Sequence, residues 1–353
     1  MNADPSDTFW VVMAAVLLCA AVVLAIVRRR RAALAPRVTD GPSVPAAGSS
    51  EPRRAAVVLN PTKFLDHGEK VRAEVTAASR ARGWADPLWL TTTAEDPGGG
   101  QTTQALQTGV QLVMACGGDG TVRAVGAALS GSSVPLALLP AGTGNLLARN
   151  LDISWSDLSA AVRTAFEGAD RAVDIGVVTL DDRPPQRFLV MAGMGFDADV
   201  MLSTSEQLKS VVGPVAYVVA GVRKLNGEHT KVSIRVDDHQ PVERGVRAVL
   251  VGNCGKLVGG MALIPRARID DGVLDTLTVA PRGIVGWANV AAAVVTRSRR
   301  GHHTMEYDRG RQVVVVAAEP MPTQLDGDGA QQARVLRASI EPGALLVRVG
   351  RPA

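Results

Sequence analysis

The chain has 353 residues, of which 46% are hydrophobic and 3% aromatic, and its formal net charge is +4. This length suits one large domain or two moderate ones, and the apolar content is enough for a sizeable core. Much of the small positive excess lies in residues 28–31, so a nucleic-acid partner is not expected.

The first segment, residues 9–27, is an unbroken apolar run. At about 1.5 Å per residue, a helix of this length can cross a hydrocarbon core of about 30 Å. The basic residues follow the run instead of preceding it, which favours a single-pass anchor (1–31) over a cleaved signal peptide. Residues 32–53 have the composition of a flexible linker. These features predict a cell-membrane protein with its catalytic domain in the cytoplasm.

Strands and helices alternate from residue 54 onward. Short apolar strands are expected at 55–59, 87–90, 110–116 and 135–139, with helices at 66–82, from 102 to 108 and at 122–129. This alternation is typical of a parallel, doubly wound α/β sheet, whose ligands bind beyond the carboxyl ends of the strands.

Three polar segments follow these strands: NPTK at 60–63, GGDGT at 117–121 and PAGTGN at 140–145. Glycines let backbone N–H groups approach a phosphate closely, and a following helix N-terminus favours the negative charge. One such loop would be weak evidence, but three at one sheet edge, with Asp119 among them, indicate a nucleotide site. The chain has neither a P-loop lysine motif nor a dinucleotide GxGxxG pattern, which argues against a P-loop enzyme and a hydride-transfer enzyme.

The second half changes character. Val-rich strands separated by turn residues predict an antiparallel β-sandwich, with strands at 188–192, 231–236, 246–251, 274–279, 313–318, 334–340 and 345–349. Apolar helices are expected at 206–225 and 284–297, and they either pack in the core or wall an acyl-chain pocket.

Two motifs, CGGDGTVRAV at 116–125 and LPAGTGNLLARNL at 139–151, resemble the catalytic domain shared by diacylglycerol kinases, sphingoid-base kinases and bacterial lipid kinases. That domain is distantly related to NAD kinases. The resemblance extends over about 54–350, through NPT (60–62), VDIG (173–176), MGFDADVM (194–201), VGN (251–253), GGMALIPRARIDDGVLD (259–275) and LDGD (325–328). It implies a nucleotide-binding α/β domain at 54–181 that is rejoined by about 335–350. It also implies a β-sandwich lipid-substrate domain at 182–334.

The resemblance implies ATP and Mg²⁺ as cofactors. Asp119 would position Mg²⁺ or the reacting groups, and Asp326 and Asp328 match an Asp-Gly-Glu that supplies the base and a metal contact. Asp174 would join a carboxylate–water–Mg²⁺ network, and Asp271 would hold a structural Mg²⁺ with the carbonyls of Arg268 and Val273. The implied nucleotide-binding residues are Asn60, Pro61, Thr62, Lys63, Thr92, Gly117, Gly118, Asp119, Gly120, Thr121, Val122, Arg123, Gly142, Thr143 and Asn145.

Two departures from the family pattern concern the site. Asp328 stands where the family usually has Glu, and Leu146 stands where many bacterial diacylglycerol kinases have Asp. The expected mechanism lets Asp326 accept the proton of a lipid hydroxyl, although the choice between Asp326 and Asp328 stays open. So does the choice of Lys63 or Arg149 as the cation that offsets developing charge.

The expected function is an ATP-dependent lipid kinase acting on diacylglycerol at the membrane. A sphingoid-base or other long-chain lipid kinase, an NAD kinase and a non-catalytic nucleotide sensor are the alternatives. A homodimer is a further expectation, because relatives often dimerise.

Overall fold

The computed structural model describes residues 52–64, 68–195, 229–257, 262–296 and 304–351. The expected anchor at 1–31, almost all of the linker and the helix at 206–225 lie outside these residues. Across the described ranges, no helix is both apolar enough and long enough to span a bilayer.

The first half forms the parallel sheet that the alternation predicted. Its strands run in the order β2-β1-β3-β4, and their bounds are β1 Ala55–Leu59, β2 Leu88–Thr91, β3 Leu112–Gly117 and β4 Leu136–Pro140. All of β1 and β3 is buried, which explains why these strands are continuous apolar runs without polar alternation.

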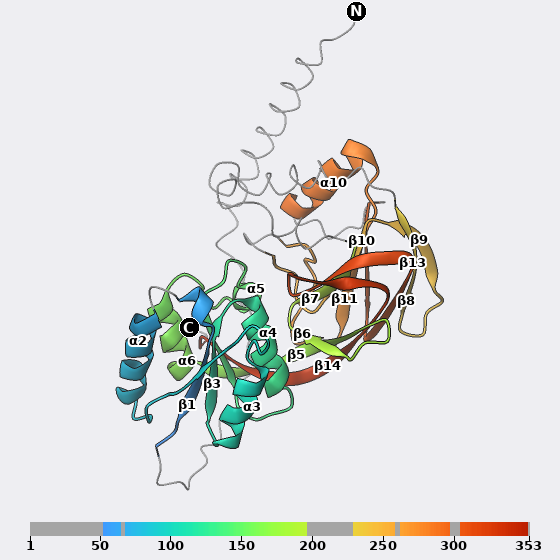
Figure 1. The fold of residues 1–353 in the computed structure, drawn as a ribbon. Helices are drawn as coiled ribbons and strands as arrows, with labels where there is room; N and C mark the ends of the chain where they lie inside the picture. The colour runs from blue at the N-terminus through green and yellow to red at the C-terminus, as the bar shows by residue number, and fades with distance from the viewer. Residues whose placement is uncertain (1–51, 65–67, 196–228, 258–261, 297–303, 352–353) are drawn as a thin grey trace, which may run out of the picture. The chain divides into compact units, whose positions relative to one another are not determined.

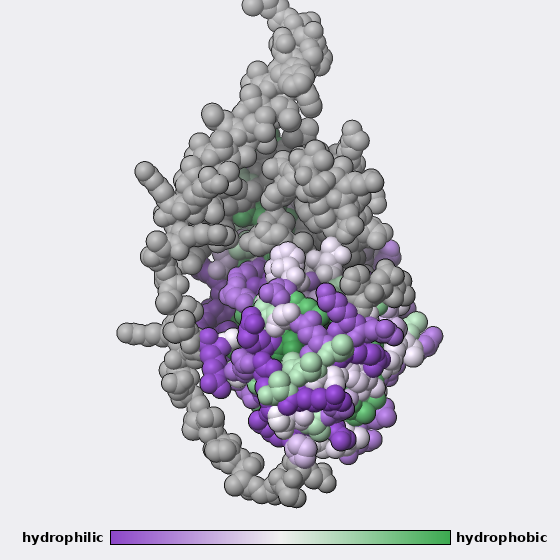
Figure 2. Space-filling model, turned by 90° about the vertical axis from the view of Figure 1, so that its left-hand side faces the viewer, coloured by the Kyte–Doolittle hydropathy of each residue, from purple (hydrophilic) through white to green (hydrophobic). Residues whose placement is uncertain are grey.

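Helices cover both faces of this sheet (Figure 1). Alternate residues of β1 and β3 belong to two separate apolar clusters, one shared with α2 and α6 and the other with α3 and α4. The helices are α2 Gly68–Arg80, α3 Gly99–Gln107, α4 Asp119–Leu129, α5 Leu146–Asn150 and α6 Leu158–Glu167, with a 3-10 turn at Pro61–Lys63. The face with α2, seen in Figure 2, is largely hydrophilic, with hydrophobic residues scattered over it.

The second half is antiparallel, as predicted. The order β12-β11-β10-β7-β13 forms one run of strands, and β8 and β9 extend from β13. The bounds are β6 Gln186–Phe188, β7 Met191–Met194, β8 Thr230–Val236, β9 Val242–Val246, β10 Ala248–Gly252, β11 Leu274–Val279, β12 Met305–Gly310 and β13 Gln312–Leu325, with α10 at Gly283–Thr296.

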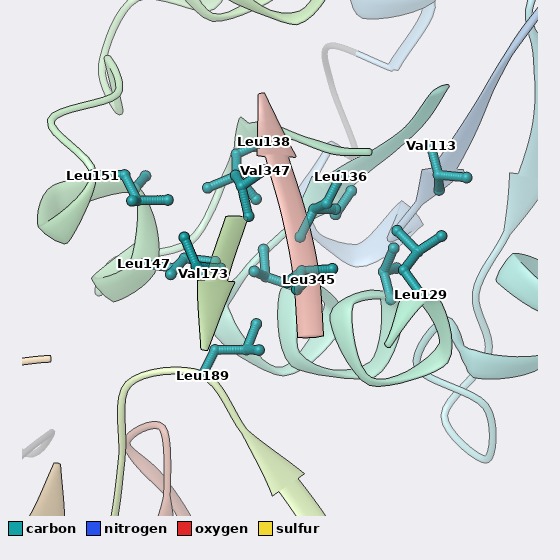
Figure 3. Packing of buried hydrophobic residues seen from close by; sticks show 14 of the residues in the cluster. Val113, Leu129, Leu136, Leu138, Leu147, Leu151, Val173, Leu189, Leu345 and Val347 are labelled. Carbon is teal, nitrogen blue, oxygen red and sulfur yellow. The ribbon is translucent and has the colours of Figure 1, made fainter. Parts of the chain in front are cut away.

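Two long strands connect the halves. β14 (Asp328–Val349) pairs with β13 at its start, with β5 (Ala169–Leu180) further along, and in parallel with β4 at Val347. Figure 3 shows Leu345 and Val347 of β14 among side chains of β4 and α5. The carboxyl end of β14 is therefore part of the core of the first half.

Two expectations about the second half need correction. The two strands expected at 334–340 and 345–349 are one strand, β14, with a register shift between Glu341 and Leu345. The strand expected at 188–192 is interrupted between Phe188 and Met191, because N–H groups there bind a side chain instead of a neighbouring strand. The strands β9 and β12 of this half, and β5 of the first half, were not predicted.

Candidate active site

The carboxyl end of β1 leads into a turn that Asn60 organises. Its side-chain oxygen accepts hydrogen bonds from the N–H of Thr62 at 3.1 Å and the hydroxyl of Thr62 at 2.8 Å. Its side-chain amide donates to the Thr121 hydroxyl at 3.4 Å. The NPTK segment is therefore joined to the first turn of α4, as expected for loops at one sheet edge.

Asp119 begins α4 and joins the second loop to the third. Its carboxylate accepts the N–H of Asn145 at 2.9 Å and that of Leu146 at 2.6 Å. The two loops approach so closely that a Cβ on Gly142 would lie 2.8 Å from the Cα of Gly118. Gly142 is thus required by the contact between the two loops.

Asn145 holds the third loop in shape. Its backbone is left-handed, with φ of 47°, which Asn tolerates better than most residues. Its side chain accepts the N–H of Gly142 at 3.0 Å and donates to the Gly142 carbonyl at 2.6 Å. Arg149 closes the loop from α5 by donating to the Gly144 carbonyl at 2.6 Å.

The Asp119 carboxyl titrates well above its usual range. Burial is the main reason that its pKa rises to about 6, and the neighbouring carboxylates of Asp326 and Asp328 raise the pKa further. The N–H groups of Leu146 and Asn145 act in the opposite direction. This coupling brings Asp119, Asp326 and Asp328 into one electrostatic site, although the residues lie about two hundred positions apart in sequence.

Asp326 and Asp328 flank the turn between β13 and β14. Asp326 and Gly327 both have positive φ, 50° and 91°, as in the tight hairpin turns that favour Asp-Gly. The turn sends the two acidic side chains into different surroundings.

Asp326 points inward and is 3% exposed. Its carboxylate accepts three backbone N–H groups, from Leu189 at 3.0 Å, Val190 at 2.8 Å and Met191 at 3.0 Å. Burial raises the pKa of Asp326, against the opposing influence of Arg123 and these N–H groups. In this arrangement, Asp326 holds the 189–191 segment against the turn between β13 and β14.

Asp328 points toward α4, and its side chain is 50% exposed. It forms an ion pair with Arg123 at 3.0 Å, and the same guanidinium donates to the Leu325 carbonyl at 2.5 Å. Its carboxylate also lies over Gly120, where a Cβ would be 3.0 Å from Oδ2. A solvent-accessible carboxylate is thereby placed against the first turn of the GGDGT helix.

The remaining nucleotide-site residues line the same edge. Thr92 is buried after β2, and its N–H binds the Leu59 carbonyl at 2.9 Å. Gly117, Thr121 and Val122 are buried, whereas Pro61, Thr62, Lys63 and Thr143 are exposed. The structure therefore brings the predicted nucleotide residues together around the ends of β1, β3 and β4.

Asp174 lies in a second acidic group. Its carboxylate accepts the N–H of Gly272 and that of Gly343, each at 2.7 Å, so it ties two loops to β5. The adjacent Asp271 forms an ion pair with Arg309, which also pairs with Asp275 at 3.0 Å. Burial and Asp271 raise the pKa of Asp275 to about 6, although Arg309 opposes this rise.

The fit of this second group to Mg²⁺ can be tested on its oxygens. Oδ1 of Asp271 and Oδ2 of Asp275 are both buried without a hydrogen-bond partner. Such oxygens normally have a partner, and hard oxygen ligands are what Mg²⁺ prefers. The donor chemistry fits a cation at Asp271, whereas nothing in the described ranges groups three or more acidic, His or Cys side chains in metal-binding geometry.

Several groups at the site were not predicted. Arg309 and Asp275 complete the second acidic group, and the N–H groups of 189–191 bind Asp326. Asp275 is the last residue of DDGVLD and lies in the strand expected at 274–279. A carboxylate inside an expected strand could have indicated that this residue belongs to the site. Arg309 lies in an ordinary surface strand, and no pattern singles it out.

The fold and the site together define a phosphotransferase of the lipid kinase class. Residues 54–178 match the diacylglycerol kinase catalytic domain, and residues 190–349 match the YegS C-terminal NAD kinase beta sandwich-like domain. The chain belongs to the bacterial diacylglycerol kinase and YegS-like lipid kinase family. Kinases of this family use ATP, and the family implies a lipid substrate.

Individual relatives agree with this placement. The chain is 34% identical to a Pseudomonas aeruginosa protein named a probable lipid kinase YegS-like, over 80% of this chain and 90% of that one. It is 29% identical to a diacylglycerol kinase of Staphylococcus carnosus, over 78% and 89% of the two chains. A crystal structure of a diacylglycerol kinase from Bacillus anthracis superposes with a TM-score of 0.65 at 20% identity, covering 86% and 98%.

Proposed function

We propose that this protein transfers the γ-phosphate of ATP to the hydroxyl of a membrane lipid, with diacylglycerol as the substrate and phosphatidic acid as the product. The observation that carries the proposal is the convergence of Asp119, Asp326 and Asp328 on glycine-rich loops at one sheet edge. Phosphoryl transfer needs such an arrangement, because it depends mainly on positioning and on compensation of charge.

The loops that would hold the nucleotide offer N–H groups and a helix start. We assign the phosphates to 117–121 and 142–145, with Lys63 and the exposed end of the NPTK turn beside them. The first turn of α4 directs its N–H groups toward an anion at this place. Whether Lys63 or Arg149 offsets the developing charge is left to mutagenesis.

We assign the general base to Asp328 and a supporting role to Asp326. A base must reach the proton that it removes. The Asp328 side chain is half-exposed, whereas both oxygens of Asp326 already accept buried N–H groups. The expected choice of Asp326 as the proton acceptor therefore has less support than the alternative.

We assign Mg²⁺ to two places. Asp119 would hold the ion that accompanies ATP, and Asp271 would hold a second one with the carbonyls of Arg268 and Val273. Bound at Asp119, Mg²⁺ would neutralise phosphate charge, and bound at Asp271 it would fix the geometry of the loop. Asp174, which binds the N–H of Gly272, belongs with the second place and not with the phosphates.

Attachment to the membrane remains part of the proposal. The apolar run at 9–27 would anchor the enzyme where its substrate lies, which raises the effective concentration of that substrate. A homodimer is also retained from the family resemblance.

The experiment is an acceptor screen with the full chain, Mg²⁺ and γ-labelled ATP in mixed micelles. The acceptors are diacylglycerol, monoacylglycerol, a sphingoid base and ceramide, with NAD in a separate tube. Label in diacylglycerol supports the proposal, and label in another lipid changes only the substrate. Label in NAD alone would assign the protein to the NAD kinases, and nucleotide binding without any transfer would favour a sensor.

A further inference from the structure

Arg123 occupies a position from which it contacts the proposed base instead of facing open solvent. It lies one turn after Asp119 on α4, so the two side chains share a face of the helix. Its side chain is 23% exposed, and its two terminal nitrogens are engaged in different directions. Nη1 donates to the Leu325 carbonyl and Nη2 pairs with Asp328.

These two acceptors lie on either side of the β13–β14 turn. Leu325 is the last residue of β13, and Asp328 is the first residue of β14. A planar guanidinium with donors in a fixed fork can hold both at once, which the single ammonium of a lysine does less well. The turn cannot rotate away from α4 without breaking both contacts.

Asp328 particularly needs such support in this chain. It is half-exposed, and on its inward side the turn is held by Asp326 and by the Gln324 side chain, which accepts the N–H of Gly327 at 2.8 Å. On the side toward α4, Gly120 provides space without a hydrogen bond, because a Cβ there would lie 3.0 Å from Oδ2. Among the described residues, Arg123 forms the ion pair that restrains the Asp328 carboxylate.

We infer that Arg123 is a positioning residue that fixes the Asp328 carboxylate over the first turn of α4, and that it does not contribute mainly to nucleotide affinity. The inference rests on the proposed function and departs from the expected role of Arg123 as an ATP ligand. A small displacement of a catalytic group costs rate in the chemical step while leaving substrate affinity largely intact.

The test compares Arg123→Ala and Arg123→Lys with the wild type in the lipid kinase assay. We expect kcat to fall about 10- to 100-fold in Arg123→Ala, with KM for ATP changed less than about 3-fold. Arg123→Lys should recover only part of the rate. Millimolar guanidinium should restore kcat of Arg123→Ala in a saturable manner, because it can refill the space between the two acceptors.

Arg80→Ala is the matched control. Arg80 also forms a two-pronged ion pair, with Asp86, but at an exposed site on α2. Its rate should equal that of the wild type and should not respond to guanidinium. A large rise in KM for ATP in Arg123→Ala, with kcat preserved, would overturn the inference and return Arg123 to the nucleotide site.

Failure of the proposed function is distinguishable from failure of this inference. If the wild type transfers phosphate to no acceptor, the proposed function is wrong. The contact between Arg123 and the turn is then tested by the unfolding free energies of Arg123→Ala, Asp328→Asn and their double variant. A non-zero coupling in their unfolding free energies supports the contact between Arg123 and the hairpin. Additive effects contradict it.

Discussion

At the scale of single residues, Asp326 and Asp328 face opposite surroundings although they lie two positions apart. One is enclosed and accepts three backbone N–H groups, and the other is half-exposed beside a guanidinium. Sequence reasoning identified both carboxylates but not their division of labour. That division depends on the left-handed turn between them and on residues 189–191, which are distant in the chain.

The same substitution at these two positions should therefore have opposite consequences. In Asp326→Asn the new NH₂ group faces an N–H donor, so we expect a loss of about 1–3 kcal/mol in unfolding free energy. In Asp328→Asn we expect an unfolding free energy within about 0.5 kcal/mol of the wild-type value. We expect turnover by this variant to be at least about 100-fold slower. Denaturant titration and kinase assays check both.

If Asp328→Asn turns over normally while the folded Asp326→Asn is inactive, the base is Asp326. The three N–H bonds would then have to open before catalysis.

Asp119 gives a prediction about pH. Its pKa of about 6 means that the ionised form needed for the proposed reaction is lost as pH falls through about 6. We therefore expect kcat/KM to fall below that pH. A profile that stays flat to pH 5 would show that an ionised Asp119 is not required.

The effect on stability has the opposite sign. A carboxyl whose pKa is raised by folding binds its proton more tightly in the folded protein than in the unfolded chain. Its contribution to stability is full below the unfolded pKa of about 3.9 and is lost as pH rises through about 6. The unfolding free energy of the wild type, relative to Asp119→Asn, should therefore decrease between pH 4 and 7.

At the scale of elements, contacts between the glycine-rich loops set the geometry of the site. A Cβ on Gly144 would lie 2.5 Å from Oδ2 of Asp119. We expect Gly144→Ala to push Asp119 out of place and to lower turnover at least about 10-fold. Gly99→Ala, within α3, meets nothing closer than 3.8 Å and should leave turnover unchanged. Equal rates in the two variants would contradict the tight loop packing.

Much of this element-scale organisation was predictable. The bounds of β1 agree with the apolar run that predicted it, because a strand buried on both sides is continuous in hydropathy. The bounds of β11 were also predicted, although Asp275 and two threonines interrupt its apolar residues. β5, β9 and β12 were missed because charged residues interrupt them. Arg171, Arg244 and Arg309, one from each strand, pair with acidic partners on loops and other strands. Those pairings depend on tertiary contacts that local patterns do not contain.

At the scale of the whole molecule, β14 ties the two halves together. It pairs with β13 of the antiparallel part and with β4 and β5 of the first half. The placement of a domain boundary at residues 181 and 182 stays a prediction, and the shared strand argues that the halves do not unfold independently.

We expect one cooperative unfolding transition for the described part of the chain. Trp84 and Trp89 report on the first half and Trp287 on the second. We would compare variants that each retain a single tryptophan, Trp84 or Trp89 in the first half and Trp287 in the second. Their denaturation midpoints should coincide. Two separated midpoints would show that β14 does not couple the halves.

The measurement that tests the central claim most directly is transfer of label from γ-labelled ATP to diacylglycerol by the full chain, compared with Asp119→Asn in the same micelles. The account predicts labelled phosphatidic acid from the wild type and a rate at least about 100-fold lower from the folded variant. Absence of labelled lipid from a wild-type protein that binds ATP, or equal rates from both proteins, would contradict it.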